Sequence, residues 1–210
     1  MNQKWDERYK GNEFAYGKEP NLFFKEWLPK FEPGGILMPA DGEGRNGVFA
    51  AQLGWQVTSF DFSAEGRSKA LQLAKEYNVV LDYIVGDFEQ LHFEKNAFDA
   101  IGFIYAHFPA EKKSMFHRKL NDTLKPGGII ILEVFSKRHL HFKELDPKVG
   151  GPEEIDMLYS KAEIIADFEN YEILLLEEDE ILLNEGKFHN GKGSVIRFVG
   201  KKGLLSPASS

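Results

Sequence analysis

The residues between positions 36 and 47 are the part of the sequence best suited to binding a ligand. They read Ile36-Leu37-Met38-Pro39-Ala40-Asp41-Gly42-Glu43-Gly44-Arg45-Asn46-Gly47, so small residues follow an apolar run and precede a helical pattern. Small residues let the backbone approach a ligand closely, and the first turn of a helix offers free N–H groups. Asp61 comes nineteen residues after Gly42, and a carboxylate at the end of the second strand can accept hydrogen bonds from ribose hydroxyls. This spacing predicts a nucleoside-binding site.

The glycine spacing alone does not decide which nucleoside cofactor binds. Gly42-x-Gly44-x-x-Gly47 also fits the dinucleotide fingerprint, so a nicotinamide cofactor is an alternative. Carboxylates of Asp41, Glu43 and Asp61 surround the loop, however, and they suit a cationic or amine-bearing ligand better than a pyrophosphate. The segment Val85-Gly86-Asp87-Phe88 adds a further acid and an aromatic ring at a strand end, which suits the amino group and the face of an adenine.

Three groups of histidines are further candidates for chemistry. His107 follows the fourth expected strand at the end where ligands bind, so it is either a base or substrate contact or an ordinary loop histidine. His139 and His141 have the spacing of a metal pair but lack an obvious third ligand, so we predict no metal site and a polar rim or loop there. His189 lies in a glycine-rich segment and belongs either to a turn or to a lid.

Strand and helix patterns alternate along the chain after residue 33. The expected strands are 36–39, 56–61, 79–85, 98–105, 129–135, 172–183 and 194–201, and the expected helices are 21–31, 45–53, 63–77, 109–124 and 152–168. Alternation of this kind predicts an α/β fold, with a Rossmann-like, seven-stranded, mostly parallel sheet and helices on both faces. The last two strands have only the short segment 184–193 between them, so we expect a C-terminal antiparallel hairpin.

Composition narrows the class of protein. The 210 residues include 26 Lys and Arg and 33 Asp and Glu, giving a net charge of -7, and this field argues against a nucleic-acid partner. The absence of cysteine excludes disulfides, thiolate metal sites and a cysteine nucleophile. The polar start and the lack of a long apolar run predict no membrane segment and a cytoplasmic location.

The order of elements resembles the class I S-adenosylmethionine-dependent methyltransferases over about residues 2–202. More narrowly, the loop 40–46 is similar to that of the tellurite-resistance and thiopurine methyltransferase group. That group's N-terminal signature resembles Trp5-Asp6-Glu7-Arg8-Tyr9, Tyr16-Gly17 and Glu19-Pro20-Asn21, and Leu124-Lys125-Pro126-Gly127-Gly128 resembles its turn before the fifth strand. With this resemblance we expect a single methyltransferase domain over 1–203, with residues 1–33 as a helical cover over the cofactor site. The end of the chain, which finishes in Pro207-Ala208-Ser209-Ser210, predicts a disordered tail over 204–210.

The resemblance also implies S-adenosylmethionine as cofactor and S-adenosylhomocysteine as product. The loop would wrap the amino-acid part of the cofactor, Asp61 would hold the ribose, and Asp87 would accept from the adenine amino group. Phe62 and Phe88 would pack on the adenine. Tyr105 would lie beside the sulfonium and the acceptor, with His107 as a second catalytic candidate. The predicted cofactor-binding residues are Trp5, Tyr16, Ala40, Asp41, Gly42, Gly44, Asn46, Asp61, Phe62, Ser63, Asp87, Phe88 and Tyr105.

Two positions in the loop differ from the general pattern of this superfamily. Met38 stands where the pattern has an acid, and Ala40 stands where it has a glycine. Asp41 is a candidate to replace the missing carboxylate. We expect a methyltransferase acting on a small-molecule acceptor, with a soft sulfur, selenium or tellurium nucleophile in view, as a monomer or homodimer. The alternatives are a small nicotinamide-dependent oxidoreductase and a non-catalytic, S-adenosylmethionine-binding regulatory protein.

Overall fold

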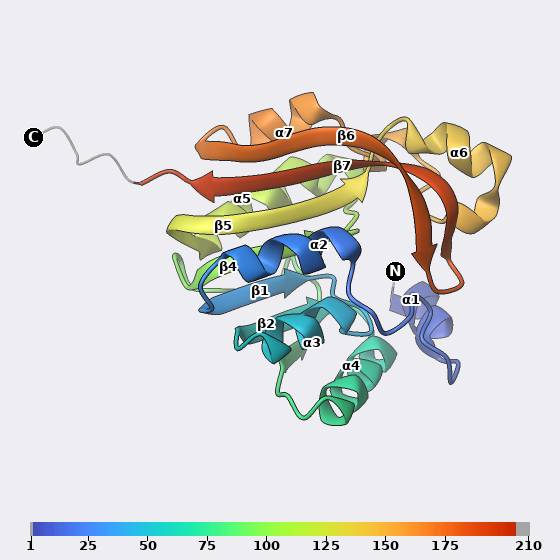
Figure 1. Ribbon diagram of the computed structural model, residues 1–210, viewed down its shortest axis with the longest axis horizontal. Helices are drawn as coiled ribbons and strands as arrows, with labels where there is room; N and C mark the ends of the chain where they lie inside the picture. The colour runs from blue at the N-terminus through green and yellow to red at the C-terminus, as the bar shows by residue number, and fades with distance from the viewer. Residues whose placement is uncertain (1, 205–210) are drawn as a thin grey trace, which may run out of the picture.

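The structure is a computed structural model that describes residues 2–204, and it contains one seven-stranded sheet (Figure 1). The strands are β1 (Gly35–Pro39), β2 (Gln56–Asp61), β3 (Asp82–Val85), β4 (Phe98–Ile104), β5 (Leu124–Phe135), β6 (Tyr171–Glu185) and β7 (His189–Lys202). They lie in the order β3-β2-β1-β4-β5-β7-β6. The first five are parallel to one another, whereas β7 is antiparallel to both β5 and β6. The predicted fold class is therefore confirmed.

Helices cover both faces of this sheet because its central strands are apolar on both sides. Ile36 and Met38 of β1 pack in one cluster with α2 (Leu22–Trp27), α3 (Arg45–Gln52) and α4 (Ala64–Glu76). Leu37, whose side chain points the other way, packs in a second cluster with α5 (Lys113–Thr123) and α7 (Lys161–Asp167). The short 3-10 helices are Leu28–Lys30, Ala110–Lys112, Pro147–Val149 and Ile155–Met157.

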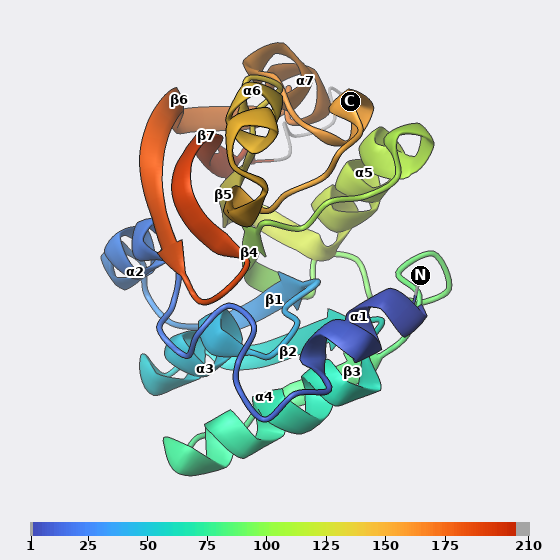
Figure 2. The same ribbon diagram turned by 90° about the vertical axis from the view of Figure 1, so that its right-hand side faces the viewer.

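Two further helices lie at the edge where the parallel strands end. Helix α1 (Asn2–Tyr9) contacts α4, and α6 (His139–Leu145) contacts β7. Figure 2 shows α1 crossing beside β3 and α4, with the tip of the β6–β7 hairpin approaching the segment that follows α1. The strand order reverses between β1 and β4, and ligands of open α/β sheets bind at the carboxyl ends of the strands at such a point.

The chain differs from the sequence prediction mainly after β5. Only 161–167 of the predicted helix 152–168 is α-helical, because Ser160 begins α7 with a capping box in which it and Glu163 satisfy each other's backbone N–H. The polar loop expected around His139 is instead helix α6. The predicted connection 184–193 is also too long, since β6 and β7 stay paired up to Glu185 and His189.

The remaining differences are small. Strand β3 begins at Asp82 rather than at 79, and β5 begins at Leu124 rather than at 129. Within residues 2–204 no helix is long and apolar enough to span a membrane. Except for the exposed Leu204, the predicted tail lies outside the described residues.

Candidate functional site

The loop between β1 and α3 has the backbone shape that its small residues predict. Ala40, Gly42 and Gly44 all have positive φ angles, of 51°, 55° and 80°. A side chain at Gly44 would collide with Ala70 of α4, so glycine is required there by packing as well as by φ. The amide of Gly44 donates to the carbonyl of Asp41 at 2.9 Å, which closes the turn just before α3 begins.

Asp61, at the end of β2, is held against this loop. Its Oδ2 accepts from the Gly42 amide at 3.1 Å, and its Oδ1 accepts from the Ser63 amide at 2.9 Å. Burial raises the pKa of Asp61 to about 6, although these backbone hydrogen bonds oppose the shift. A carboxylate that is fixed in this way still has free lone pairs, so it can accept hydrogen bonds from the two vicinal hydroxyls of a ribose.

Asp41 and Glu43 are buried and are paired with groups of the protein. Asp41 accepts from the Ser59 hydroxyl at 2.7 Å and from the Gly47 amide at 3.3 Å, and burial raises its pKa to about 7. Glu43 accepts from the Ala15 amide at 2.7 Å and pairs with Lys69 at 2.7 Å. Asp41 therefore holds the loop through Ser59 and Gly47, and its contact with the cofactor stays a prediction.

The N-terminal segment lies over the loop and is tied to it by polar contacts. Asp6 accepts from the hydroxyl of Ser63, the residue that caps α4, at 2.5 Å. A Cβ at Gly42 would lie 2.7 Å from the Tyr9 hydroxyl, so the ring of Tyr9 sits directly on the loop. Asn46 accepts from the backbone amide of Asn21 at 2.9 Å. Figure 2 shows this segment passing across the carboxyl ends of the strands.

Aromatic rings gather where β4 and β5 end. Tyr105 has a φ of 50°, and its ring centroid lies 4.7 Å from those of Phe135 and His189. Tyr16, from the N-terminal segment, lies 4.5 Å from His189 on the same side. Trp5 is one turn of helix before Tyr9 and stacks on it at 5.7 Å. The faces of these rings suit a cationic centre such as a sulfonium.

Tyr105 is anchored by a buried carboxylate on β5. Glu133 is 1 % exposed and accepts from the Tyr105 hydroxyl at 2.8 Å, from Asn21 Nδ2 at 2.6 Å and from Arg197 Nε at 2.6 Å. Burial and then the Glu133 charge raise the pKa of Tyr105 well above its ordinary value. Tyr105 is therefore a neutral hydrogen-bond donor rather than a base.

A second carboxylate joins the hairpin to the glycine loop. Glu185 pairs with Arg45 of α3 at 2.9 Å and contacts His189 Nδ1 at 3.1 Å and Asn21 Nδ2 at 3.1 Å. Burial alone would raise its pKa, but the Arg45 and His189 contacts outweigh burial and lower it to about 2. The hairpin, the loop and the N-terminal segment thus share one buried network.

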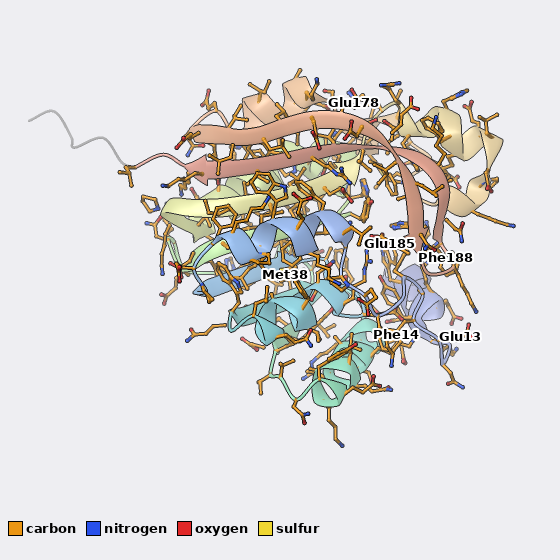
Figure 3. All side chains as sticks on the ribbon, viewed as in Figure 1. Glu13, Phe14, Met38, Glu178, Glu185 and Phe188 are labelled. Atoms are coloured by element: carbon orange, nitrogen blue, oxygen red, sulfur yellow. The ribbon has the colours of Figure 1, made fainter. Side chains whose placement is uncertain are left out.

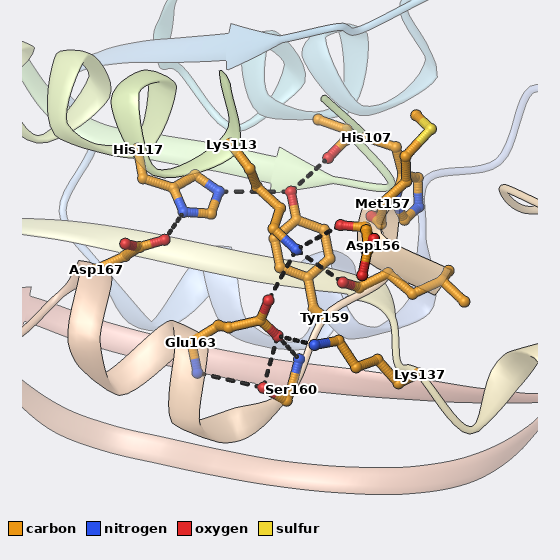
Figure 4. Close-up of polar contacts among 12 residues, drawn as sticks. His107, Lys113, His117, Lys137, Asp156, Met157, Tyr159, Ser160, Glu163 and Asp167 are labelled. Atoms are coloured by element: carbon orange, nitrogen blue, oxygen red, sulfur yellow. Dashed lines mark hydrogen bonds and ion pairs between the residues drawn. The ribbon is translucent and has the colours of Figure 1, made fainter. Parts of the chain in front are cut away.

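His107 stacks on the ring of Phe135, with 5.6 Å between the ring centroids. Its Nδ1 lies 3.3 Å from the Met157 carbonyl, which can only accept, so Nδ1 carries the proton (Figure 4). Its Nε2 is buried without a hydrogen-bond partner among the described residues, and burial lowers its pKa to about 3. His107 is therefore a neutral imidazole with an unused acceptor nitrogen.

Figure 4 also shows the polar contacts that support the segment carrying His107. Tyr159 donates to the Ala106 carbonyl at 3.4 Å, and its hydroxyl lies 3.4 Å from His117, which in turn contacts Asp167 at 2.6 Å. Lys113 donates to the Leu158 carbonyl at 2.8 Å. These contacts fix the chain between β4 and α5.

The predicted adenine contacts separate in the structure. Phe62 is half-buried after β2, and Asp87 is half-buried with its Oδ1 accepting from the Glu89 amide at 2.9 Å. Phe88 is instead 1 % exposed, stacked on Phe60 at 4.8 Å and enclosed by further rings of the core. No face of Phe88 is open to a ligand, so its predicted packing on adenine is not supported.

Sequence reasoning missed the buried network. Its members outside the prediction are Asn21, Arg45, Glu133, Glu185 and Arg197. The signal was a lone acid within the apolar run 129–135, since an ionised side chain in a buried strand requires a partner. Among residues 2–204 no group of three or more His, Asp or Glu side chains is arranged to hold a metal ion.

Comparison with known proteins shows that the chain is similar to methyltransferases. Residues 36–128 match the family model described as a methyltransferase domain. A sterol 24-C-methyltransferase of Saccharomyces cerevisiae is 29% identical over 125 residues, which are 57% of this chain and 32% of that protein. A glycine/sarcosine N-methyltransferase of Aphanothece halophytica is 27% identical over 170 residues, 73% of this chain and 63% of that protein. The chain thus spans less than two thirds of each relative.

Solved structures share the fold over most of the chain. A structure described as "Conversion of a Disulfide Bond into a Thioacetal Group during Echinomycin Biosynthesis" has a TM-score of 0.76 at 16% identity and covers 99% of this chain and 95% of its own. TehB from Haemophilus influenzae has a TM-score of 0.68 at 16% identity, with 85% and 61% covered. Residues 36–128 thus resemble a methyltransferase domain, and S-adenosylmethionine is the cofactor that this match and the fold imply, as the sequence predicts.

Proposed function

We propose that this protein transfers the methyl group of S-adenosylmethionine to a small-molecule acceptor. The observation that carries the proposal is the junction of Asp61 with the glycine loop, in which the Gly42 amide donates to the Asp61 carboxylate at 3.1 Å. That junction places a hydroxyl-binding acid and a loop of small residues at the carboxyl ends of the strands, close to the point between β1 and β4 where the strand order reverses. A bound S-adenosylmethionine would supply an electrophilic methyl group.

The positions of the surrounding residues support the following roles. Asp61 binds the ribose hydroxyls, Phe62 packs on the adenine, and Asp87 accepts from the adenine amino group. The loop from Ala40 to Gly44 wraps the amino-acid part, while the Gly42 amide stays bonded to Asp61. The N-terminal residues 1–33, which include Trp5 and Tyr16, cover the cofactor and exclude water. Asn46 and Ser63 hold this cover in place, because Asn46 accepts from the Asn21 amide and Ser63 donates to Asp6.

Tyr105 orients the acceptor beside the reactive centre. Its hydroxyl is committed to Glu133, so it presents a ring face rather than a base. Desolvation and alignment are therefore the main contributions of this part of the site. His107 is the second catalytic candidate, because its unused Nε2 can accept a hydrogen bond while burial, which lowers its pKa to about 3, keeps the ring neutral.

The acceptor class is the finer part of the proposal. The resemblance to the tellurite-resistance and thiopurine group favours a soft sulfur, selenium or tellurium nucleophile, which needs no base. The fold likeness to TehB and to the thioacetal-forming enzyme agrees with that choice. An amine is the second candidate, because one relative is named a glycine/sarcosine N-methyltransferase and Nε2 of His107 is an unused hydrogen-bond acceptor.

A radiolabelled methyl-transfer assay distinguishes these acceptors. Purified protein is incubated with methyl-labelled S-adenosylmethionine and a panel of thiols, selenols, tellurite, primary amines and hydroxyl compounds. Transfer to thiols or tellurite that survives His107→Asn supports a soft acceptor, whereas transfer to amines that is lost in His107→Asn supports the second candidate. Tight cofactor binding without transfer to any compound would instead favour a non-catalytic regulatory protein.

A further inference from the structure

Arg8 of α1 is packed between aromatic rings at the entrance to the candidate site. Its guanidinium carbon lies 5.1 Å from the centre of the Trp5 ring and 4.5 Å from the centre of the Phe188 ring. Its Nη1 donates to the Tyr16 hydroxyl at 2.6 Å. A guanidinium has five N–H donors, so this arrangement fixes the group while leaving most of its donors unused.

No carboxylate of the described residues pairs with Arg8, even though acids outnumber basic residues in the chain. The neighbouring acids already have partners. Glu13 pairs with Lys187, and Glu185 pairs with Arg45 at 2.9 Å. Figure 3 shows Glu13 and Phe14 of the N-terminal segment below the hairpin tip that carries Glu185 and Phe188. The charge of Arg8 is therefore not neutralised by the protein around it.

Other cations add to this local positive field. Burial, and in addition the charges of Lys4 and Arg8, lower the pKa of Lys143 on α6, against the opposing effect of Glu153. The ammonium of Lys143 donates to the Gly151 carbonyl at 2.5 Å and lies 3.8 Å from the exposed Glu153. Lys4 and Arg8 are therefore close enough to Lys143 for their charges to act on it, in a protein whose net charge is -7.

A chain of contacts joins Arg8 to the reacting end of the site. Tyr16, which accepts from Arg8, lies 4.5 Å from His189, and His189 lies 4.7 Å from Tyr105. Arg8 is therefore two rings away from the residue assigned beside the methyl group. A planar group that is held at this position can bind a carboxylate or another oxyanion through two parallel N–H donors.

We propose that Arg8 binds an oxyanion of the reacting ligands, either the carboxylate of the cofactor's amino-acid part or an anionic group of the acceptor. The proposal rests on the proposed function for the identity of those ligands. It gives Arg8 a binding role that a purely structural cation, stacked between Trp5 and Phe188, would not have.

Calorimetric titration of wild type and Arg8→Gln separates the two sources. S-adenosylhomocysteine carries the carboxylate, whereas 5'-methylthioadenosine has the same nucleoside without it. If the cofactor is the source, the variant binds S-adenosylhomocysteine at least about tenfold more weakly and methylthioadenosine equally well. If the acceptor is the source, both nucleosides bind equally, and anions from a panel of small carboxylates, selenite and tellurite bind the variant at least about tenfold more weakly.

Two matched variants separate loss of the guanidinium group from loss of a positive charge in general. Arg8→Lys keeps the charge without the planar fork and should show an intermediate loss, whereas Lys10→Gln removes an exposed charge from the same region and should bind all ligands as wild type does. Thermal unfolding of each variant checks that it folds. The anion panel is titrated with and without S-adenosylhomocysteine, so the role of Arg8 is tested even if no nucleoside binds. Failure of the wild type to bind either nucleoside therefore counts against the proposed function and not against the role of Arg8. Equal S-adenosylhomocysteine affinity in wild type and Arg8→Gln, together with anion binding that is equal or absent in both, would overturn the role of Arg8.

Discussion

Replacing Asp61 by Asn tests the ribose contact directly. The carboxylate of Asp61 is 8% exposed, and its two oxygens accept from the Gly42 and Ser63 amides at 3.1 and 2.9 Å. An Asn side chain retains one acceptor oxygen and places an NH₂ group where the second stood. One charged hydrogen bond contributes about 1.5–3 kcal/mol, so the affinity for S-adenosylmethionine should fall by roughly 10- to 150-fold.

The same substitution also affects the fold, so the assay needs a matched control. In Asp61→Asn the NH₂ group faces a backbone N–H, which should lower the melting temperature. Asp99→Asn removes a comparable carboxylate at the opposite end of the sheet, where it accepts from the Gly35 amide at 2.9 Å and pairs with Lys125 at 2.7 Å. Calorimetric titration at a temperature where both variants are folded should show weakened binding for Asp61→Asn alone. Unchanged affinity in Asp61→Asn, or an equal loss in Asp99→Asn, would refute the reasoning.

Three other outcomes follow from the same geometry. Burial raises the folded-state pKa values of Asp41 and Asp61 to about 7 and 6, so their stabilising contribution is fully present below about pH 4 and is lost as the pH rises to 7. In Asp41→Asn, the free energy of unfolding measured in urea should therefore decline less between pH 4 and pH 7 than in the wild type. Phe88→Ala should lower the free energy of unfolding by about 3–5 kcal/mol because it empties a core position, whereas Phe62→Ala should weaken cofactor binding with little change in unfolding. Glu43→Gln should speed hydrogen exchange of the amides of residues 13–21, because Glu43 holds the Ala15 amide and Lys69, and exchange as slow as in wild type would contradict this account of the cover.

Local patterns were sufficient to predict the sheet and the loop. A buried strand followed by small residues and a helix fixes the position of Gly42, and the spacing to Asp61 follows from one strand–helix–strand unit. The end of the chain was predicted for the same reason, since two strands without a helix between them must form a hairpin. These features depend on neighbours in sequence.

Side-chain direction after a strand end is less predictable from sequence. Phe62 and Phe88 both follow a strand and an acid, yet Phe62 is half-buried and Phe88 stacks on Phe60 in the core. The helix predicted over 152–168 failed similarly, because the capping box of Ser160 sets the start of α7. Composition alone shows neither choice.

Long-range polar partners were beyond the sequence pattern. Arg45 and Glu185 are 140 positions apart, and Asn21 and Glu133 are 112 apart. Such contacts arise only when the hairpin and the N-terminal segment meet over the loop. The lone acid in β5 indicated that a partner was needed but not which residue would supply it.

The central claim, that this loop and Asp61 bind S-adenosylmethionine, is tested most directly by calorimetric titration of the unmodified protein with S-adenosylmethionine, S-adenosylhomocysteine and NADH. The account predicts saturable binding of both adenosyl compounds at one site per chain and no heat from NADH. Binding of NADH alone, or of none of the three, would contradict it.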